Sequence, residues 1–286
     1  MVIPTKIEIC QLVDVRRMAE ITADCKRVYF GHETCEKLLP AFDEVQDLLE
    51  MTAKRQLKLS FVTPFLTERG MDKVILFLEK LKTMKLNSFE IVSSDWGLIH
   101  YVINNKAGTP VVGRFLAGQQ VDFRLMEQVH ESKEQIVCLD GCYHQLAQRK
   151  MPPALVEHIS SATLLKNKTL EMLRRAGVVR FELSNVIQPI VLPDFPSCRY
   201  SLHLPFVPLA IFRTCPESAD FNKPRKDCSA YNCNHNRQRW QYDAKKRDLY
   251  CIDNALYYYH PDVDAHLQQH RLIDRIVIHS RAPDIV

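Results

Sequence analysis

The sequence alternates short apolar runs with amphipathic stretches of helical spacing along most of its length. This spacing predicts strands at Lys6–Leu12, Arg27–Phe30, Leu57–Val62, Phe89–Ser93, Pro110–Arg114, Leu155–Ser160, Val178–Leu183, Tyr200–Ile211 and Arg275–His279. It predicts helices at Asp14–Thr22, Cys35–Arg55, Met71–Thr83, Trp96–Asn104 and Thr169–Ala176. Repeated β–α units indicate parallel strands joined by crossover helices, and about seven or eight units favour a TIM-type (β/α) barrel over an open sheet.

One segment, from Pro216 to Asp248, interrupts this alternation. It is rich in polar residues, prolines and cysteines, and it has no helical period. Loops longer than ~15 residues without secondary structure of their own are uncommon and are usually functional or disordered. The pattern therefore predicts a long loop that a bound metal holds in place.

Ten cysteines occur in the chain, and three of them lie in or beside this segment with the spacing Cys215-x12-Cys228-x4-Cys233. In a reducing compartment, clustered thiols indicate metal ligands or catalysis before disulfides. A [4Fe–4S] cluster and a structural zinc ion each take four ligands, so a further residue must complete the set. The spacing leaves both metals open, because Cys228-x4-Cys233 resembles half of a zinc knuckle and His235 is nearby.

Cys35 is the best candidate for the fourth ligand. It follows the predicted strand Arg27–Phe30, and Cys215 follows the predicted strand that ends at Phe212. In a parallel barrel both positions lie at the carboxyl ends of strands, where active sites gather. A helix beginning at Cys35 would also favour its thiolate. Cys251 is the alternative fourth ligand. The other thiols are interpreted as ordinary buried side chains, namely Cys10, Cys25, Cys138, Cys142 and Cys198.

Composition excludes several common classes of protein. Only 8 glycines occur in 286 residues, and the sequence has no dinucleotide-binding, P-loop, zinc-protease or nucleophile-elbow motif. The formal charge of +4 is spread along the chain, so a nucleic-acid partner is possible but not favoured. No apolar run reaches the ~18 residues that a transmembrane helix needs, and the N-terminus lacks a signal-peptide core. We therefore expect a cytoplasmic protein.

Several polar residues are candidates for substrate contacts. Asp95 and Trp96 follow a predicted strand and could line a pocket for an aromatic substrate, although a helix cap and a core indole are the simpler interpretation. Arg114 and Arg124 could hold an anionic substrate, and a surface salt bridge explains them equally well.

Four further features have a structural and a functional interpretation. Arg213 could raise the potential of a nearby cluster or be a solvated surface cation. Glu182 could carry protons or be a polar rim group. His203 alternates with leucines, which favours a satisfied interior imidazole over a ligand. The run Tyr257–Tyr259 predicts strand packing or part of a partner surface.

The chain resembles the U32 peptidase-like family, and within it the branch of UbiV-like ubiquinone-biosynthesis proteins. The likeness covers most of the sequence. It is carried by VYFGHETC at 28–35, FEIVSSDWGLIHYV at 89–102, PVVGRFLAGQQVDFR at 110–124, VVRFELSNV at 178–186 and PLAIFRTC at 208–215. Two features depart from the family pattern: the last cysteine gap has four residues instead of three, and VDFR replaces the usual D-P-R.

The resemblance implies a single U32-like barrel domain over residues 1–286, with a cluster-binding loop at 212–251. It implies a [4Fe–4S] cluster held by Cys35, Cys215, Cys228 and Cys233. The implied role is oxygen-independent hydroxylation in ubiquinone biosynthesis, as a heterodimer with a UbiU-like protein. The substrate would be an aromatic small molecule or an isoprenoid quinone precursor.

Three alternatives remain at this point. Other branches of the family hydroxylate RNA. A zinc-stabilised interaction protein would use the same thiolates as a structural clamp. Peptidase activity is the historical family label, but the sequence has neither a catalytic-triad signature nor a zinc-protease helix.

Overall fold

The computed structural model of the chain describes residues 7–84, 86, 88–121, 136–137, 143–144, 152–195, 197–212, 237–242, 247–262 and 271–279. Cys215, Cys228 and Cys233 lie outside the described residues, as do Cys138, Cys142, Arg124, Arg213 and His235. Within the part of the chain that is described, no helix is long and apolar enough to cross a membrane.

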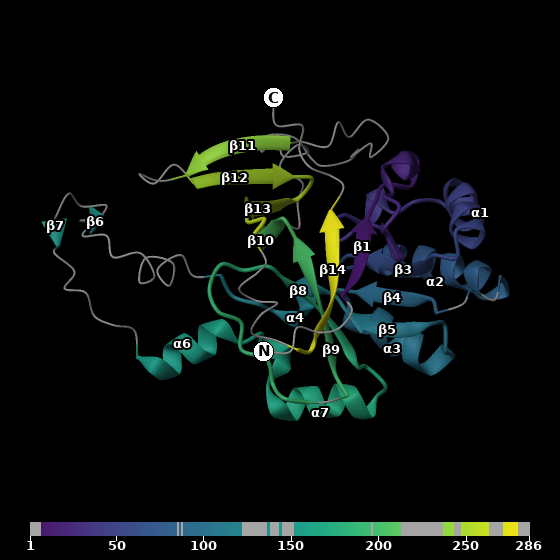
Figure 1. Ribbon diagram of the computed structural model, residues 1–286. Helices are drawn as coiled ribbons and strands as arrows, with labels where there is room; N and C mark the ends of the chain where they lie inside the picture. The colour runs from purple at the N-terminus through teal and green to yellow at the C-terminus, as the bar shows by residue number, and fades with distance from the viewer. Residues whose placement is uncertain are drawn as a thin grey trace.

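Eight strands close into a barrel, and each pairs in parallel with its neighbours (Figure 1). Their order around the barrel is β1 (Glu8–Leu12), β14 (Ile273–His279), β9 (Arg199–Leu204), β8 (Arg180–Ser184), β5 (Thr109–Val112), β4 (Glu90–Ser93), β3 (Lys58–Thr63) and β2 (Arg27–Gly31). The predicted TIM-type (β/α) barrel is confirmed. The first and last strands of the chain close it by pairing with each other.

Helices lie on the outside of the barrel and, from β1 to β8, between successive barrel strands (Figure 1); among the described residues none separates β8 from β9. The α-helices are α1 (Gln46–Lys54), α2 (Glu68–Thr83), α3 (Trp96–Asn105), α4 (Arg114–Ala117), α6 (Pro153–Ser160) and α7 (Asn167–Arg175). Short 3-10 helices add η1 (Val15–Glu20), η2 (Glu36–Leu38), η3 (Asp43–Val45) and η4 (Thr163–Leu165). The helix predicted at Asp14–Thr22 is therefore the 3-10 helix η1.

Two other predicted elements were wrong, and proline explains both. The helix predicted at Cys35–Arg55 is broken into η2, η3 and α1, because Pro40 forces Leu39 into an extended conformation (φ −63°, ψ 131°). The strand predicted at Leu155–Ser160 is the helix α6 instead. Pro153 occupies its first position, where a missing N–H has no cost and a fixed φ favours a helix.

The barrel interior is lined by apolar side chains along its length and by charged side chains at the amino ends of the strands, here called the floor. Alternate residues of β2 face opposite ways, so Tyr29 packs inside while Val28 and Phe30 pack against the helices. The other inner apolar residues are Cys10, Leu12, Val62, Val92, Val111 and Val277. This alternation places the polar residues of β8, β9 and β14 on the remaining inner surface.

The floor of the barrel, at the amino ends of the strands, is a buried ion network. Arg275 donates to Glu90 Oε2 at 2.8 Å and to Glu8 Oε2 at 3.0 Å. Arg27 lies 3.3 Å from the same Glu90 oxygen. Burial alone would raise the pKa of Glu90, but Arg275 and then the other two guanidiniums nearby hold it below its ordinary value. Glu90 therefore stays ionised, and its ion pairs with the arginines fill this end of the barrel.

A second sheet lies at the carboxyl ends of the barrel strands (Figure 1). It is antiparallel, in the order β10 (Phe206–Ile211), β13 (Ala255–Tyr259), β12 (Arg247–Ile252) and β11 (Arg237–Tyr242). The backbone N–H of His260 donates to Pro205 O at 2.7 Å and ties this sheet to β9. A small two-stranded sheet contains β6 (Ile136–Val137) and β7 (Tyr143–His144).

This second sheet corrects two expectations. Residues 206–211 were predicted to belong to the parallel alternation of barrel strands, and they form an edge strand of the antiparallel sheet instead. Residues 237–242, predicted as part of a loop, pair with β12. The run Tyr257–Tyr259 lies in β13, as predicted.

Candidate functional site

A cluster of two histidines and one glutamate lies at the carboxyl ends of the barrel strands. His203 lies in β9, His279 ends β14, and Glu33 follows β2. His203 Nδ1 is 2.9 Å from His279 Nε2, and each of these nitrogens is 3.9 Å from an oxygen of Glu33. All three side chains are buried. One potential ligand atom from each residue falls within 4.8 Å of the other two.

Glu182 fixes the orientation of His203 from inside the barrel. Its Oε2 accepts from His203 Nε2 at 2.8 Å, and its Oε1 accepts from the Tyr29 hydroxyl at 3.0 Å. Arg275 in turn donates to the Tyr29 oxygen at 2.7 Å, so the chain of bonds reaches the charged floor. Because a carboxylate only accepts, the proton of His203 is on Nε2, and the lone pair of Nδ1 accepts from His279 Nε2 at 2.9 Å.

Arg114 forms a buried bidentate ion pair with Glu33. Its Nε and Nη2 donate to the two carboxylate oxygens at 2.8 and 2.6 Å, and its Nη1 donates to Phe206 O at 2.6 Å. Burial alone would raise the pKa of Glu33, but Arg114, followed by His279 and His203, lowers it to about 2. Of the two interpretations of Arg114, the structure shows a salt bridge, but a buried one and not the surface pair that was expected.

The turn that carries Cys35 is held by His32 and Asp253. The Cys35 backbone N–H donates to His32 Nδ1 at 3.0 Å, which requires the imidazole proton to be on Nε2. That Nε2 lies 3.0 Å from Asp253 Oδ2, and both side chains are buried. The turn is therefore anchored to the β12–β13 connection of the second sheet. Cys35 caps only a three-residue 3-10 turn, so the expected stabilisation of its thiolate by a full helix N-terminus was wrong.

Asn254 joins the Cys35 turn to the end of β10. Its Nδ2 donates to Thr34 O at 2.8 Å and to Phe212 O at 3.0 Å, and its carbonyl accepts from Phe212 N at 2.7 Å. Thr34 immediately precedes Cys35, and Phe212 comes three residues before Cys215 in the sequence. The turn before Cys35 and the end of β10 at Phe212 therefore meet at the carboxyl end of the barrel, although β10 is not a barrel strand and Cys215 itself lies outside the described residues.

The described cysteines divide by exposure. Cys35 is half-buried at the barrel mouth, whereas Cys251 is fully buried in β12. Cys10, Cys25 and Cys198 are also buried, and burial raises the pKa of each thiol. The interpretation of these three as core thiols is confirmed.

Asp95 and Trp96, which follow β4, have different environments. Asp95 caps α3, because its Oδ1 accepts from Leu98 N at 3.1 Å. The Trp96 side chain is not in the core, since the residue is 44% exposed. The simpler interpretation was therefore right for the cap and wrong for the indole.

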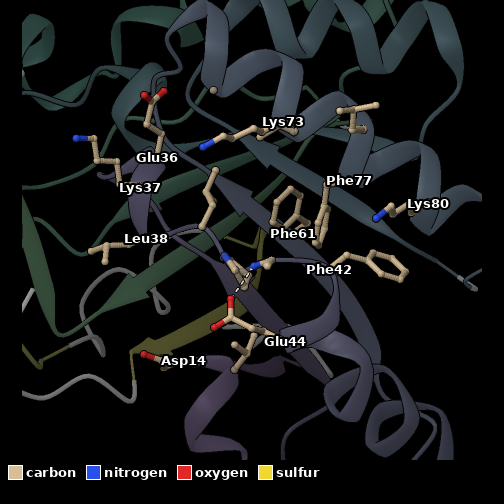
Figure 2. Close-up of a pocket in the computed structure, with 18 of the residues that line it drawn as sticks. Asp14, Glu36, Lys37, Leu38, Phe42, Glu44, Phe61, Lys73, Phe77 and Lys80 are labelled. Carbon is tan, nitrogen blue, oxygen red and sulfur yellow. Dashed lines mark hydrogen bonds between the residues drawn. The ribbon is translucent and has the colours of Figure 1, made fainter. Parts of the chain in front are cut away.

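A cavity of about 700 Å³ lies outside the barrel wall, between η2, η3 and α2 (Figure 2). Phe61 and Phe77 stack at 4.7 Å between ring centroids, and Figure 2 shows them between Lys73 and Lys80. Among the described residues, neither lysine has a carboxylate partner within ion-pair distance. The lining also includes Glu36, the residue after Cys35.

The lining carboxylates of this cavity already have partners. Glu36 accepts from the backbone and hydroxyl of Thr67 at 2.7 and 2.9 Å, and Glu44 accepts from Ala41 N at 2.7 Å. Asp14 accepts from Arg16 at 2.9 Å. The unpaired charges of the cavity are therefore cationic, and its floor is aromatic.

Sequence reasoning missed three residues of the barrel mouth: Tyr29, Glu33 and His279. The motif GHETC places Glu33 directly beside the cysteine that was singled out, so its position was a usable signal. His279 ends the last predicted strand, as His203 lies near the end of another, and parallel strands bring such ends together. Tyr29 gave no signal, because an aromatic residue in a strand is most often core.

Comparisons with known proteins add little to this geometry. No family model matches the sequence, and no curated protein gives a significant match. Among solved structures, the chain is similar to one described as the U32 peptidase Mk0906, with 12% sequence identity and a TM-score of 0.44. That alignment covers 96% of this chain and 93% of the other. A likeness of this strength carries no argument about activity, so the site is interpreted from its own residues.

Proposed function

We propose that the chain is an iron–sulfur protein that takes part in oxygen-independent hydroxylation, as the UbiV-like subunit of a UbiU–UbiV type complex in ubiquinone biosynthesis. Cys35, Cys215, Cys228 and Cys233 would hold a [4Fe–4S] cluster at the carboxyl end of the barrel. When bound, the cluster would supply one-electron redox chemistry beside the barrel mouth.

The double hydrogen bond of Asn254 is the observation that supports this proposal most. It holds the residue before Cys35 against the residue from which the chain leads to Cys215. Three residues of chain span no more than roughly 11 Å, so the covalent chain alone keeps Cys215 within reach of the Cys35 turn. This contact supports the proposal that cysteines 180 positions apart in the numbering share one cluster.

The surroundings of Cys35 suit a cysteine that binds a metal better than a cysteine that attacks a substrate. Both ring nitrogens of His32 are engaged, by Asp253 and by the backbone of Cys35, so this imidazole has no nitrogen left to deprotonate the thiol. A cysteine peptidase needs such a base beside its nucleophile. The same bonds fix the backbone of the turn, which is what a metal ligand requires.

The cavity beside Cys35 is our candidate for the aromatic substrate. Its volume of about 700 Å³ falls within the range of small-molecule sites. Stacked phenylalanines offer a face to an aromatic ring, and Lys73 and Lys80 could pair with a carboxylate. An aromatic carboxylate of the kind from which isoprenoid quinones are built has both features.

Two exposed aromatic residues are our candidates for contact with the partner subunit. Phe65 follows β3 and Trp96 follows β4, and they are 48% and 44% exposed. Their loops are joined by a hydrogen bond from Leu66 N to Asp95 Oδ2 at 3.3 Å. Because exposed aromatic residues are enriched in interfaces, Trp96→Ser should weaken co-purification with a UbiU-like protein, whereas Leu76→Ser on α2 should not.

Spectroscopy of cysteine variants tests the proposed function. Anaerobically purified wild-type protein should show the visible charge-transfer absorption of an iron–sulfur cluster, and Cys35→Ser should lose most of it. Cys10→Ser is the matched control, because Cys10 is buried inside the barrel and should leave the spectrum unchanged. A Cys35→Ser protein with a wild-type spectrum would exclude Cys35 as a ligand and remove the main support for the proposal.

A further inference from the structure

We propose that Glu33, His203 and His279 form a binding site for a single divalent first-row transition-metal ion. The site is separate from the cysteine ligands of the proposed cluster and does not depend on them. It goes beyond the proposed function, because it adds a second metal at the mouth of the same barrel.

The donor atoms have the spacing that one ion requires. Ligands at about 2.1 Å from a metal lie roughly 3.0 to 3.4 Å apart when they are adjacent in octahedral or tetrahedral geometry. The two imidazole nitrogens share a hydrogen bond at 2.9 Å, whose proton an ion would displace; His203 Nδ1 is 3.9 Å from Glu33 Oε1 and His279 Nε2 is 3.9 Å from Glu33 Oε2. Because each nitrogen faces a different oxygen of Glu33, the carboxylate would bind through both oxygens or move by roughly 1 Å to place the donors around one ion.

A carboxylate behind His203 completes the arrangement expected of a metal-ligating histidine. Such histidines almost always donate their second N–H to a carboxylate, a carbonyl or water, which fixes the tautomer. Glu182 accepts from His203 Nε2 at 2.8 Å, so Nδ1 presents its lone pair to the cluster. Glu182 is itself held by Tyr29, and both residues are fully buried. This outer contact is an observation independent of the three donor atoms.

Charge also favours a cation at this position. Glu33 and Glu182 carry two negative charges, and Arg114 supplies one positive charge, so with neutral imidazoles the site has a net negative charge. Arg114 occupies one lone pair on each oxygen of Glu33, and each oxygen keeps a second one.

The donor set indicates the class of ion. Two imidazoles and one carboxylate suit first-row transition metals, and in the facial arrangement they are typical of ferrous sites with open positions. Three protein ligands would leave positions for water or substrate, as in catalytic rather than structural sites. The triad lies at the carboxyl ends of the strands, where barrel enzymes place their chemistry.

Cobalt(II) is the probe for this site. The experiment uses the full-length Cys35→Ser/Cys215→Ser/Cys228→Ser/Cys233→Ser variant, so that the proposed cluster does not contribute metal or absorption. Titration with Co²⁺ should give ligand-field bands in the visible that saturate at about one ion per chain. Because this variant lacks the proposed cluster ligands, cobalt binding by it tests the Glu33–His203–His279 site alone, whatever the outcome of the cluster experiment.

Histidine variants in the same background identify the ligands. His279→Gln, at a strand end, should weaken Co²⁺ binding by more than about 100-fold, because outer contacts alone are worth 10- to 100-fold. Glu182→Gln should weaken it by about 10- to 100-fold. His100→Gln is the control, since His100 is exposed on α3 and, among the described residues, hydrogen-bonds only with Asn104. Circular dichroism checks that each variant is folded. Absence of saturable cobalt bands, or equal binding by His279→Gln and His100→Gln, would overturn the proposal.

Discussion

Replacement of Glu33 by glutamine should reveal how strongly the barrel mouth depends on one buried charge. Glu33→Gln keeps the size of the side chain and removes its negative charge beside Arg114. The side chain of Glu33 is only 9% exposed, so solvent screens this pair weakly. We expect the variant to fold and to be markedly less stable at neutral pH.

The magnitude follows from the pKa of Glu33. Its ordinary value of 4.5 falls to about 2 in the folded protein. A displacement of about 2.5 in pKa corresponds to roughly 3 kcal/mol of folding free energy at neutral pH. Breaking a buried ion pair by removing one partner costs about 3–5 kcal/mol, which agrees with this value.

The pH dependence has a defined sign. A carboxyl group with a lowered pKa in the folded state stabilises the protein above its unfolded pKa, and this contribution is lost as pH falls toward the folded pKa. By pH 3 about 2 of the roughly 3 kcal/mol should be gone. The stability difference between wild type and Glu33→Gln should therefore be constant above pH 6 and shrink between pH 5 and pH 3.

Urea denaturation across this pH range measures the effect. Chelator-treated proteins should be compared, so that metal bound at Glu33 does not contribute. Glu50→Gln is the control, because the side chain of Glu50 is 71% exposed in a surface pair with Lys54 and should change stability by less than about 0.5 kcal/mol. A loss below about 1 kcal/mol at pH 7, or a loss that does not change with pH, would refute the reasoning.

Three further predictions concern other parts of the molecule. Tyr29→Phe should lower stability by about 1–3 kcal/mol in thermal or urea unfolding, because Arg275 and Glu182 lose a buried partner, and an unchanged stability would contradict the network. Gly31→Ala should cost roughly 3 kcal/mol or more, since its φ is 111° and a methyl group would meet Val62 O; a folded variant of wild-type stability would be the contrary result. Lys73→Met should weaken binding of 4-hydroxybenzoate about tenfold in calorimetry, with Lys54→Met as control. Equal affinities in these two lysine variants would remove the proposed substrate role of the cavity.

Periodicity was sufficient to predict the barrel and most of its helices. In α2 the residues Val74, Phe77, Leu78 and Leu81 are buried at three- and four-residue spacing, and Asp95 begins α3 as a cap. These are local signals, because spacing and capping depend on residues within a few turns of each other. The barrel follows from them, since repeated β–α units have few ways to close.

Longer-range features could not be predicted from one sequence. Glu33 and Arg114 are separated by 81 residues, and His203 and His279 by 76, so nothing local indicates that they pair. Strand content also does not say which sheet a strand joins, and β10 leaves the barrel for the antiparallel sheet. Trp96 looked like a core residue from its type alone, while its position at the first residue of α3 leaves it exposed.

Metal and sulfide analysis after strictly anaerobic purification tests the proposed function most directly. The account predicts about four iron and four sulfide ions per chain in a cluster-loaded wild-type protein. It predicts that Cys35→Ser loses both, while the buried-thiol variant Cys10→Ser retains them. Zinc in place of iron and sulfide, or a full iron and sulfide content in Cys35→Ser, would contradict it.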